Sequence, residues 1–299
     1  MSTTPDLDNL PDVFRGSEAR KAGLITAGQL RGPSVRRLFQ DVYAPAQVVV
    51  THELRCRGAA LIAPEEAVLT GRSAATVLGV ELAQPLDPVE FVVPEKFRFG
   101  PIDGIHIRRT EVVKKESRPW SGVRIAKPAR VALDLLLRLS PRKRGWVRRL
   151  RIGVPDLDVF LRSGLVRRST LERQVWGRRN RGIRLARHAV ELSDPRAESL
   201  PESELRVVLN IGGFHPKPQH NVRKKRVFLG RLDLAIEASK VAIEYDGRWH
   251  NTPDQVIHDR ERRRRLITEG WAFVIVDSDQ LATDYSGILE RVRAATERS

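Results

Sequence analysis

Three acids on two neighbouring strand-like segments are the residues of this chain best placed to do chemistry together. The first segment, Arg231–Ile236, carries Asp233, and the second, Val241–Gly247, carries Glu244 and Asp246. Because side chains alternate along a strand, Glu244 and Asp246 share one face, and Asp233 joins them if the strands pair as a hairpin. Three carboxylates on one patch repel each other unless a cation lies between them. Oxygen ligands with open positions suit Mg²⁺ or Mn²⁺ and not zinc, so the pattern predicts a metal site.

His250 follows Asp246 by four residues and is near enough in sequence to reach the same patch. The ordinary alternative is that each acid lies at a solvated edge or pairs with a nearby arginine, and for a single acid that alternative is favoured. For the three acids and His250 together, beside apolar strands, the pattern favours a functional site.

The order of these residues carries a family resemblance. Asp233, ten further residues and then the run Glu244–His250 (EYDGRWH) resemble the active-site core of the PD-(D/E)XK nuclease superfamily. More narrowly, they resemble the domain family related to very-short-patch-repair (Vsr-type) endonucleases. The flanking segments Glu202–Arg206 and 259–271 resemble the opening helix of that family and its late helix and strand. The resemblance therefore covers about residues 196–282.

This resemblance implies a metal-dependent endonuclease that hydrolyses phosphodiester bonds in DNA. Asp233 and Glu244 would hold Mg²⁺ or Mn²⁺, which polarises the scissile phosphate and lowers the pKa of a bound water. The wider superfamily has a lysine where this chain has Asp246, whereas an aspartate is usual in the narrower family. Asp246 would add a metal ligand or position His250. His250 would orient or deprotonate the attacking water, or protonate the leaving oxygen.

Glu202 has two interpretations. It shares a helix face with Leu205 and Leu209, and a carboxylate that faces a core requires a partner. Arg206, four residues further on, would provide one as a surface ion pair. The resemblance implies instead that Glu202 is an additional acid beside the metal site.

The elements that must position these residues alternate between strands and helices from about residue 194. This alternation predicts an α/β domain over 194–299, and the resemblance implies the restriction-endonuclease-like α/β/α fold. The expected strands are 219–222, 227–236, 241–245 and 271–276, and the expected helices are 202–210 and 254–269.

Two arginine-rich segments are candidates for nucleic-acid binding. One is the helix 254–269. The other is 141–190, where 14 Arg and one Lys against three acids give a net charge of +12, interleaved with apolar residues. This interleaving predicts ordered helices with basic faces. The run Arg260–Arg265 in the helix 254–269 would usually be a solvated face, but beside a nuclease site it is equally suited to binding a phosphate backbone. The candidates are Arg260, Arg262, Arg263, Arg264, Arg148, Arg149, Arg178 and Arg179.

The N-terminal segment is predicted to be a small winged helix. Helical stretches over 17–40 end with a short helix at Val35–Leu38, capped by Ser34, and a strand follows. Phe14–Ala19 and Asp41–Pro45 also resemble the antitoxin-type winged-helix module that is found upstream of this nuclease family in actinobacteria. The expected α+β multidomain chain has a winged-helix-like DNA-binding module at 1–50, a mixed α/β antitoxin-type domain at 51–140, a basic helical connector at 141–193 and the nuclease domain at 194–299.

Composition narrows the class of protein. Fifty-three Lys and Arg against 37 Asp and Glu give a net charge of +16, which favours a polyanionic partner. The single cysteine, Cys56, excludes an internal disulfide framework and a zinc site of several thiolates. The first residues lack the regions of a secretory signal, and no apolar run approaches the roughly 20 residues that span a bilayer. We therefore expect a cytoplasmic protein whose partner is DNA and not a membrane, with a partner toxin left open.

Two other functions fit part of this pattern. One is a DNA-binding, antitoxin-type transcriptional regulator in which the nuclease fold is retained but idle. Such a protein has no physical reason to keep mutually repelling carboxylates. The other is a membrane-surface protein, which fits the charge but lacks an amphipathic anchor.

Overall fold

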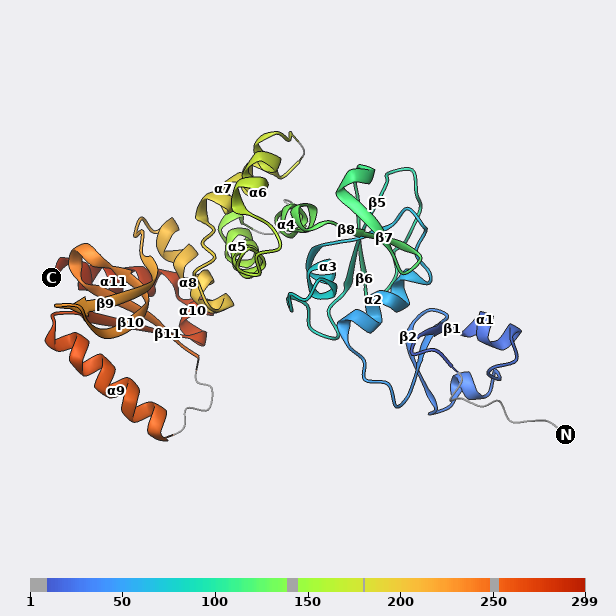
Figure 1. The fold of residues 1–299 in the computed structure, drawn as a ribbon, viewed down its shortest axis with the longest axis horizontal. Coiled ribbons are helices and arrows are strands. Elements are labelled where there is room, and N and C mark those ends of the chain that lie inside the picture. The colour runs from blue at the N-terminus through green and yellow to red at the C-terminus, as the bar shows by residue number, and fades with distance from the viewer. Residues whose placement is uncertain (1–9, 139–144, 180, 248–252, 299) are drawn as a thin grey trace. The chain divides into compact units, whose positions relative to one another are not determined.

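The structure is a computed structural model that describes residues 10–138, 145–179, 181–247 and 253–298 (Figure 1). Its contacts divide the chain into two compact units, Met1–Arg138 and Leu139–Ser299. The described residues form helices and three separate sheets. The general prediction of a mixed α/β chain with more than one unit is therefore confirmed.

The N-terminal unit begins with a small antiparallel sheet in the order β1-β3-β2. Its strands are β1 (Phe14–Arg15), β2 (Val35–Phe39) and β3 (Val42–Pro45), accompanied by α1 (Gly16–Lys21) and the 3-10 turn η2 (Gln29–Arg31). The short helix predicted at Val35–Leu38 is wrong, because these residues pair with β3 across a tight turn at Asp41, where φ is 59°. Val35 and Phe39 are buried at the two ends of the strand, and five residues are too few for sequence periodicity to separate the two conformations.

A second sheet follows in the same unit, in the order β6-β5-β4-β8-β7. Two of its strands lie at 89–93 and 105–109, and an apolar helix begins at Pro128. Val68 and Leu69 belong to a strand, and the helix that follows begins at Gly71. The elements are α2 (His52–Ala60), β4 (Val68–Leu69), α3 (Gly71–Val77), β5 (Val89–Val93), β6 (Ile105–Arg109), η3 (Lys114–Glu116), β7 (Ser117–Trp120), β8 (Val123–Ala126) and α4 (Pro128–Leu137).

The C-terminal unit contains the candidate site and opens with three helices. Its remaining helices flank one sheet in the order β12-β11-β10-β9, in which the β11–β12 pair is parallel and the other pairs are antiparallel. The expected strands and the two expected helices of this region are all present. The elements are α5 (Trp146–Arg162), α6 (Arg168–Trp176), α7 (Ile183–Leu192), α8 (Leu200–Ile211), β9 (Lys217–Lys224), β10 (Val227–Ile236), η4 (Glu237–Ser239), β11 (Val241–Asp246), α9 (Pro253–Thr268), β12 (Ala272–Asp277), α10 (Ser278–Thr283) and α11 (Tyr285–Glu297).

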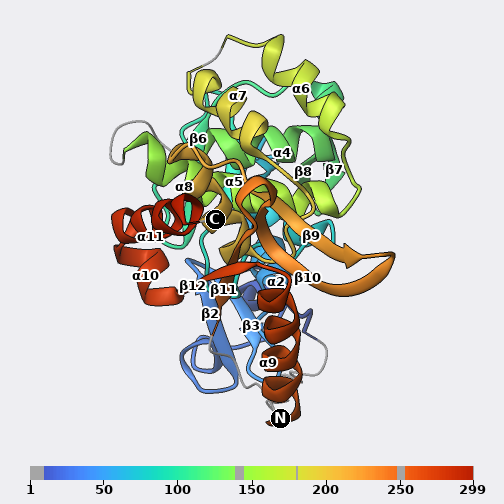
Figure 2. The same cartoon turned by 90° about the vertical axis from the view of Figure 1, so that its left-hand side faces the viewer.

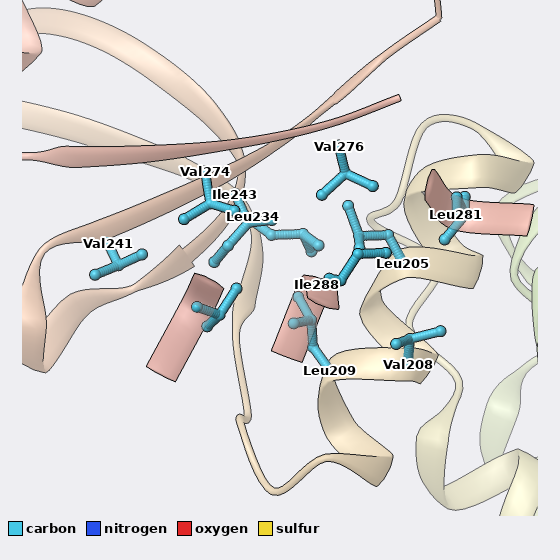
Figure 3. Close-up of a cluster of buried hydrophobic side chains, with 11 residues drawn as sticks. Leu205, Val208, Leu209, Leu234, Val241, Ile243, Val274, Val276, Leu281 and Ile288 are labelled. Atoms are coloured by element: carbon cyan, nitrogen blue, oxygen red, sulfur yellow. The ribbon is translucent and has the colours of Figure 1, made fainter. Parts of the chain in front are cut away.

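The two faces of this sheet pack against different helices. On one face Leu234 and Ile243 join Leu205 of α8 and Ile288 of α11 in a buried apolar cluster (Figure 3). On the other face α9 places Leu266 against the sheet. Alternation along β11 sends Ile243 into the first cluster and directs Glu244 toward α9, so the fold itself aims this acid at the arginine-rich helix.

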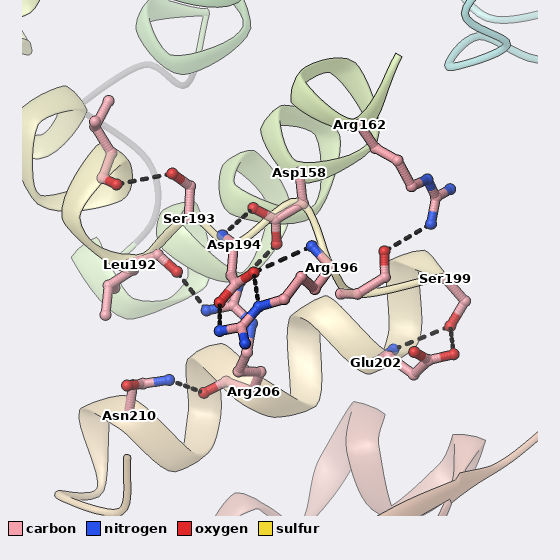
Figure 4. Close-up of polar contacts among 12 residues, drawn as sticks. Asp158, Arg162, Leu192, Ser193, Asp194, Arg196, Ser199, Glu202, Arg206 and Asn210 are labelled. Carbon is pink, nitrogen blue, oxygen red and sulfur yellow. Dashed lines mark hydrogen bonds and ion pairs between the residues drawn. The ribbon is translucent and has the colours of Figure 1, made fainter. Parts of the chain in front are cut away.

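A buried ion pair joins α5 to α8. Arg206 donates to the Oδ2 of Asp158 over 2.5 Å and also donates to the carbonyl of Leu192, while the N–H of Asp194 donates to Asp158 Oδ1 over 2.7 Å (Figure 4). Burial raises the pKa of Asp158 to about 6. Both side chains are almost fully buried, so helix α5 of the basic segment is fixed onto the opening helix of the candidate nuclease fold.

Candidate functional site

The hairpin that was predicted to bring the acids together is confirmed. Strands β10 and β11 pair antiparallel with Leu234 opposite Ile243, which places Asp233 and Glu244 one step further along the same register. The N–H of Tyr245 donates to Asp233 Oδ2 over 3.3 Å. Pairing of the backbone therefore holds these two carboxylates on adjacent strands, on the sheet face that α9 covers.

Asp233 has the most perturbed environment of these acids. Burial raises its pKa to about 7, and the negative charges of Glu202 and Glu244 add to the shift. The N–H of Tyr245 and the charge of Arg262 act in the opposite direction. A carboxyl group in this state keeps its proton near neutral pH unless positive charge arrives, and this is the electrostatic condition of a site that favours a cation.

Glu244 already has cationic partners in the structure. Its side chain is 3% exposed, and its Oε1 and Oε2 accept from the two terminal nitrogens of Arg262 over 2.8 and 3.2 Å. The Nε of Arg263 also donates to Oε2, over 3.1 Å. For Glu244 the ordinary alternative, pairing with arginine, is thus the arrangement observed. A metal ion would have to replace at least one guanidinium group to bind here.

Glu202 lies in the first turn of α8 and does not pair with Arg206, so the surface ion pair, one of its two interpretations, is not formed. Arg206 instead pairs with Asp158 inside the unit. The Glu202 carboxylate accepts from the Oγ of Ser199 over 2.8 Å, from the N–H of Glu198 over 3.1 Å and from the Nε2 of Gln219 over 2.8 Å. All three of these donors are neutral, and the negative charge of Glu202 helps to raise the pKa of Asp233.

The remaining candidate acid, Asp246, is exposed at the end of β11. His250 belongs to 248–252, which lie outside the described residues. Within the described part of the chain, no three His, Cys, Asp or Glu side chains form a group that could hold a metal ion. The described site is therefore a pair of strand carboxylates with Glu202 near enough to influence one of them.

The predicted nucleic-acid-binding arginines fall into two groups. Arg262 and Arg263 point toward Glu244, whereas Arg260 and Arg264 are exposed on α9. Within the basic segment, Arg148 and Arg179 are exposed, while Arg149 and Arg178 are half-buried. Part of the basic charge therefore serves internal pairing, and part faces solvent.

The β9–β10 hairpin has a basic tip that the sequence reasoning missed. Residues 223–226 are Arg-Lys-Lys-Arg, followed by exposed Val227 and Phe228. A groove of about 410 Å³ runs from Phe228 to Asp233 along α9. The signal in the sequence was a cationic run and a phenylalanine between two strand patterns.

A larger cavity of about 990 Å³ lies elsewhere, along β12 and α11, and none of its lining residues is acidic.

Fold and site together define a mixed α/β protein in which a β-hairpin holds an acidic pair against an arginine-rich helix. No family model matches the chain. It is 31% identical over 150 residues, 49% of its length, to the uncharacterized proteins Rv2248 and MT2308 of two Mycobacterium tuberculosis strains. The alignment covers 55% of each, so the chain spans about half the length of the curated relatives it matches.

Among solved structures, the crystal structure of the RV2827C protein from Mycobacterium tuberculosis matches 70% of this chain and 75% of its own. The two are 18% identical, with a TM-score of 0.37. In the described residues, no helix has both the length and the apolar character needed to cross a membrane.

Proposed function

We propose that the protein is a metal-dependent endonuclease that hydrolyses phosphodiester bonds in DNA. The observation that carries this proposal is the antiparallel pairing of β10 and β11, which holds Asp233 and Glu244 on adjacent strands near Glu202. Repulsion from Glu202 and Glu244 adds to the burial that raises the pKa of Asp233 to about 7, and a bound divalent cation would relieve this repulsion. The sequence resemblance to Vsr-type nucleases points to the same residues independently.

The donor chemistry of this site suits Mg²⁺ or Mn²⁺. Asp233 and Glu244 offer carboxylate oxygens from adjacent strands, and the partly protonated Asp233 would be fully ionised beside a divalent ion. When bound, the ion supplies Lewis-acid activation of phosphate and water. Asp246 and His250 keep the roles that the resemblance implies, namely an added ligand or positioning residue and a proton-transfer group.

The direct test is nicking of supercoiled plasmid DNA by the full chain. Cleavage should require Mg²⁺ or Mn²⁺ and stop when the metal is chelated. Asp233→Ala, purified identically, should be inactive, which excludes a contaminating nuclease. Nicking that survives in this variant would exclude Asp233 from the active site.

A second candidate function is a DNA-binding regulator with an idle nuclease fold. The observation that favours it is the pairing of both Glu244 oxygens with Arg262 and Arg263. DNA binding together with absence of metal-dependent nicking in the wild-type chain would support this alternative.

Arg263→Gln provides a prediction about metal affinity. The substitution removes one of the two cations that compete for Glu244, so Mn²⁺ affinity should rise by about three- to tenfold. Isothermal titration with Mn²⁺ measures this change without any need for turnover. Arg264→Gln removes an equal charge from an exposed position of α9 and should change the affinity less. Equal effects of the two substitutions would mean that only net charge matters and not the contact with Glu244.

The basic segment 141–190 gives a prediction about DNA binding. If about six of its side chains neutralise phosphates, the logarithm of the duplex binding constant should fall with log[salt] at a slope of about −5. Fluorescence anisotropy over a salt series with metal chelated measures this slope. A slope shallower than about −2 would remove this segment as the main phosphate contact.

A further inference from the structure

The tip of the β9–β10 hairpin keeps its positive charge at a conformational cost. Its two turn residues, Lys225 and Arg226, have φ angles of 45° and 73°. A two-residue turn with both φ angles positive is normally built from Asn and Gly, because the Cβ of most other residues lies too close to the backbone there. Residues held in such conformations cluster at functional sites. The hairpin extends beyond the rest of the sheet, so these side chains are presented to solvent (Figure 2).

An exposed aromatic ring stands beside this basic tip. Phe228 is 50% exposed, and the guanidinium of Arg223 lies 5.8 Å from the centre of its ring. The pairing of β10 with β9 shifts register between Phe228 and Gly230. At Gly230 an added Cβ would lie 3.0 Å from the Cγ of Arg262, so glycine allows α9 to approach the strand closely. The fold thus places the ring at the edge of a groove next to α9.

This groove joins the aromatic ring to the candidate site. Its volume of about 410 Å³ lies in the range of sites that hold small molecules. Phe228 and Asp233 both line it, together with Arg262 and the exposed Arg265. Arg262 is engaged by Glu244, whereas Arg265 projects from the next turn of the same helix. An aromatic ring and a guanidinium group in one groove match the base and the phosphate of a nucleotide.

We propose that this groove binds one unpaired nucleotide of single-stranded DNA, with Phe228 stacked on the base and Arg265 on its phosphate. In a duplex each base is already stacked on its neighbours on both faces. Phe228 could therefore not stack on a duplex base, whereas an unpaired base has a free face. The inference rests on the proposed function in one respect. Asp233 lines the same groove, so a nucleotide bound there would lie beside the phosphate that the proposed nuclease cleaves. It goes further by naming an unpaired strand as the preferred substrate.

Binding of a single-stranded oligonucleotide that contains 2-aminopurine tests this proposal, with metal chelated so that no cleavage occurs. Stacking on an aromatic side chain contributes about 1–3 kcal/mol per base, so Phe228→Ala should weaken binding by about 5- to 150-fold and reduce the change in probe fluorescence that binding produces. Phe228→Trp should retain both the binding affinity and the response of the probe. Val227→Ala, at a neighbouring exposed residue outside the groove, is the matched control and should bind as wild type does. Arg265→Gln should reduce the salt slope by about 0.7.

Three outcomes would overturn the proposal. The first is equal binding of the oligonucleotide by Phe228→Ala and wild type. The second is binding of a matched duplex that depends on Phe228 to the same extent. The third is tighter binding of single-stranded RNA than of single-stranded DNA of the same sequence. The result is separable from the nuclease function because it needs no catalysis. If the groove variants behave as expected but plasmid is never nicked, the nucleotide-binding proposal is supported and the nuclease proposal is contradicted. If plasmid is nicked and Phe228→Ala binds the oligonucleotide as wild type does, the nuclease proposal is supported and the nucleotide-binding proposal is contradicted.

Discussion

Asp233→Asn is expected to abolish DNA cleavage and, at the same time, to stabilise the fold at pH 8. Asparagine is close in shape to aspartate but lacks the charge that a metal ligand needs at this position. Loss of such a ligand removes several kcal/mol of charge stabilisation. Because each 1.4 kcal/mol corresponds to a factor of ten, the rate should fall by about 100-fold or more.

The stabilising effect follows from the raised pKa of Asp233. In the unfolded chain this carboxyl ionises near its ordinary value of 3.8, whereas in the fold it keeps its proton up to about pH 7. Between these values the folded state binds more protons than the unfolded state, so the contribution of Asp233 to stability falls as pH rises. Well above pH 7 the folded state bears the full free-energy cost of holding the ionised Asp233 carboxylate. Burial is the largest cause of this cost, Glu202 and Glu244 add to it, and the N–H of Tyr245 and the charge of Arg262 reduce it.

Chemical denaturation of wild type and Asp233→Asn at several pH values measures this contribution. The free energy of unfolding of the variant should exceed that of wild type by about 1–4 kcal/mol at pH 8, and the difference should shrink toward zero near pH 4. Taking the difference removes the titration of the other acids. Added Mg²⁺ should raise the melting temperature of wild type more than that of the variant. A variant that cleaves normally, or that loses stability at pH 8, would contradict the assignment.

Glu244→Gln is the informative comparison because it should separate the two effects. Cleavage should be lost as in Asp233→Asn, but the fold should lose stability, since Arg262 and Arg263 would face a neutral group. DNA affinity should be unchanged or improved in both variants, because removing negative charge cannot weaken attraction to phosphate. Opposite signs of the stability change would show that the two acids have different electrostatic roles.

Most elements of the C-terminal unit were predictable because their sequence signals are long and locally consistent. The alternation in Val241–Asp246 and the apolar side chains of β10 gave both strands and the faces on which Asp233 and Glu244 lie. Over five residues, as at Val35–Phe39, the same reasoning failed, because pairing with β3 decided the conformation. The local sequence pattern therefore predicts an element well only where pairing with a segment distant in sequence does not decide its conformation.

The partners of charged residues were much less predictable. Glu202 and Arg206 are four residues apart on one helix, which suggests an ion pair, yet each bonds to other groups that the tertiary fold supplies. The contact of Glu244 with Arg262 likewise depends on how α9 packs on β10, which no spacing in the sequence specifies. Sequence reasoning therefore placed the acids on the right strands but could not assign their counter-charges.

Asp158→Ala is expected to have the largest effect on stability. The substitution leaves the almost fully buried Arg206 without its carboxylate and the N–H of Asp194 without its acceptor. Breaking a buried ion pair by removing one partner costs about 3–5 kcal/mol, because the remaining charge stays buried and uncompensated. The transition of the C-terminal unit in calorimetry should therefore move to markedly lower temperature.

Two controls isolate the cause of this loss. Glu172→Ala removes the acid of an ion pair with Arg168 whose side chains are 39% and 41% exposed, and it should cost at most about 0.5 kcal/mol. The double variant Asp158→Leu/Arg206→Met replaces the buried pair by apolar groups and should recover much of the stability. If Asp158→Ala cost no more than Glu172→Ala, the buried pair would not be what fixes α5 to α8. If the double variant were as unstable as the single one, the shape and hydrogen bonds of Asp158 would matter more than the uncompensated charge of Arg206.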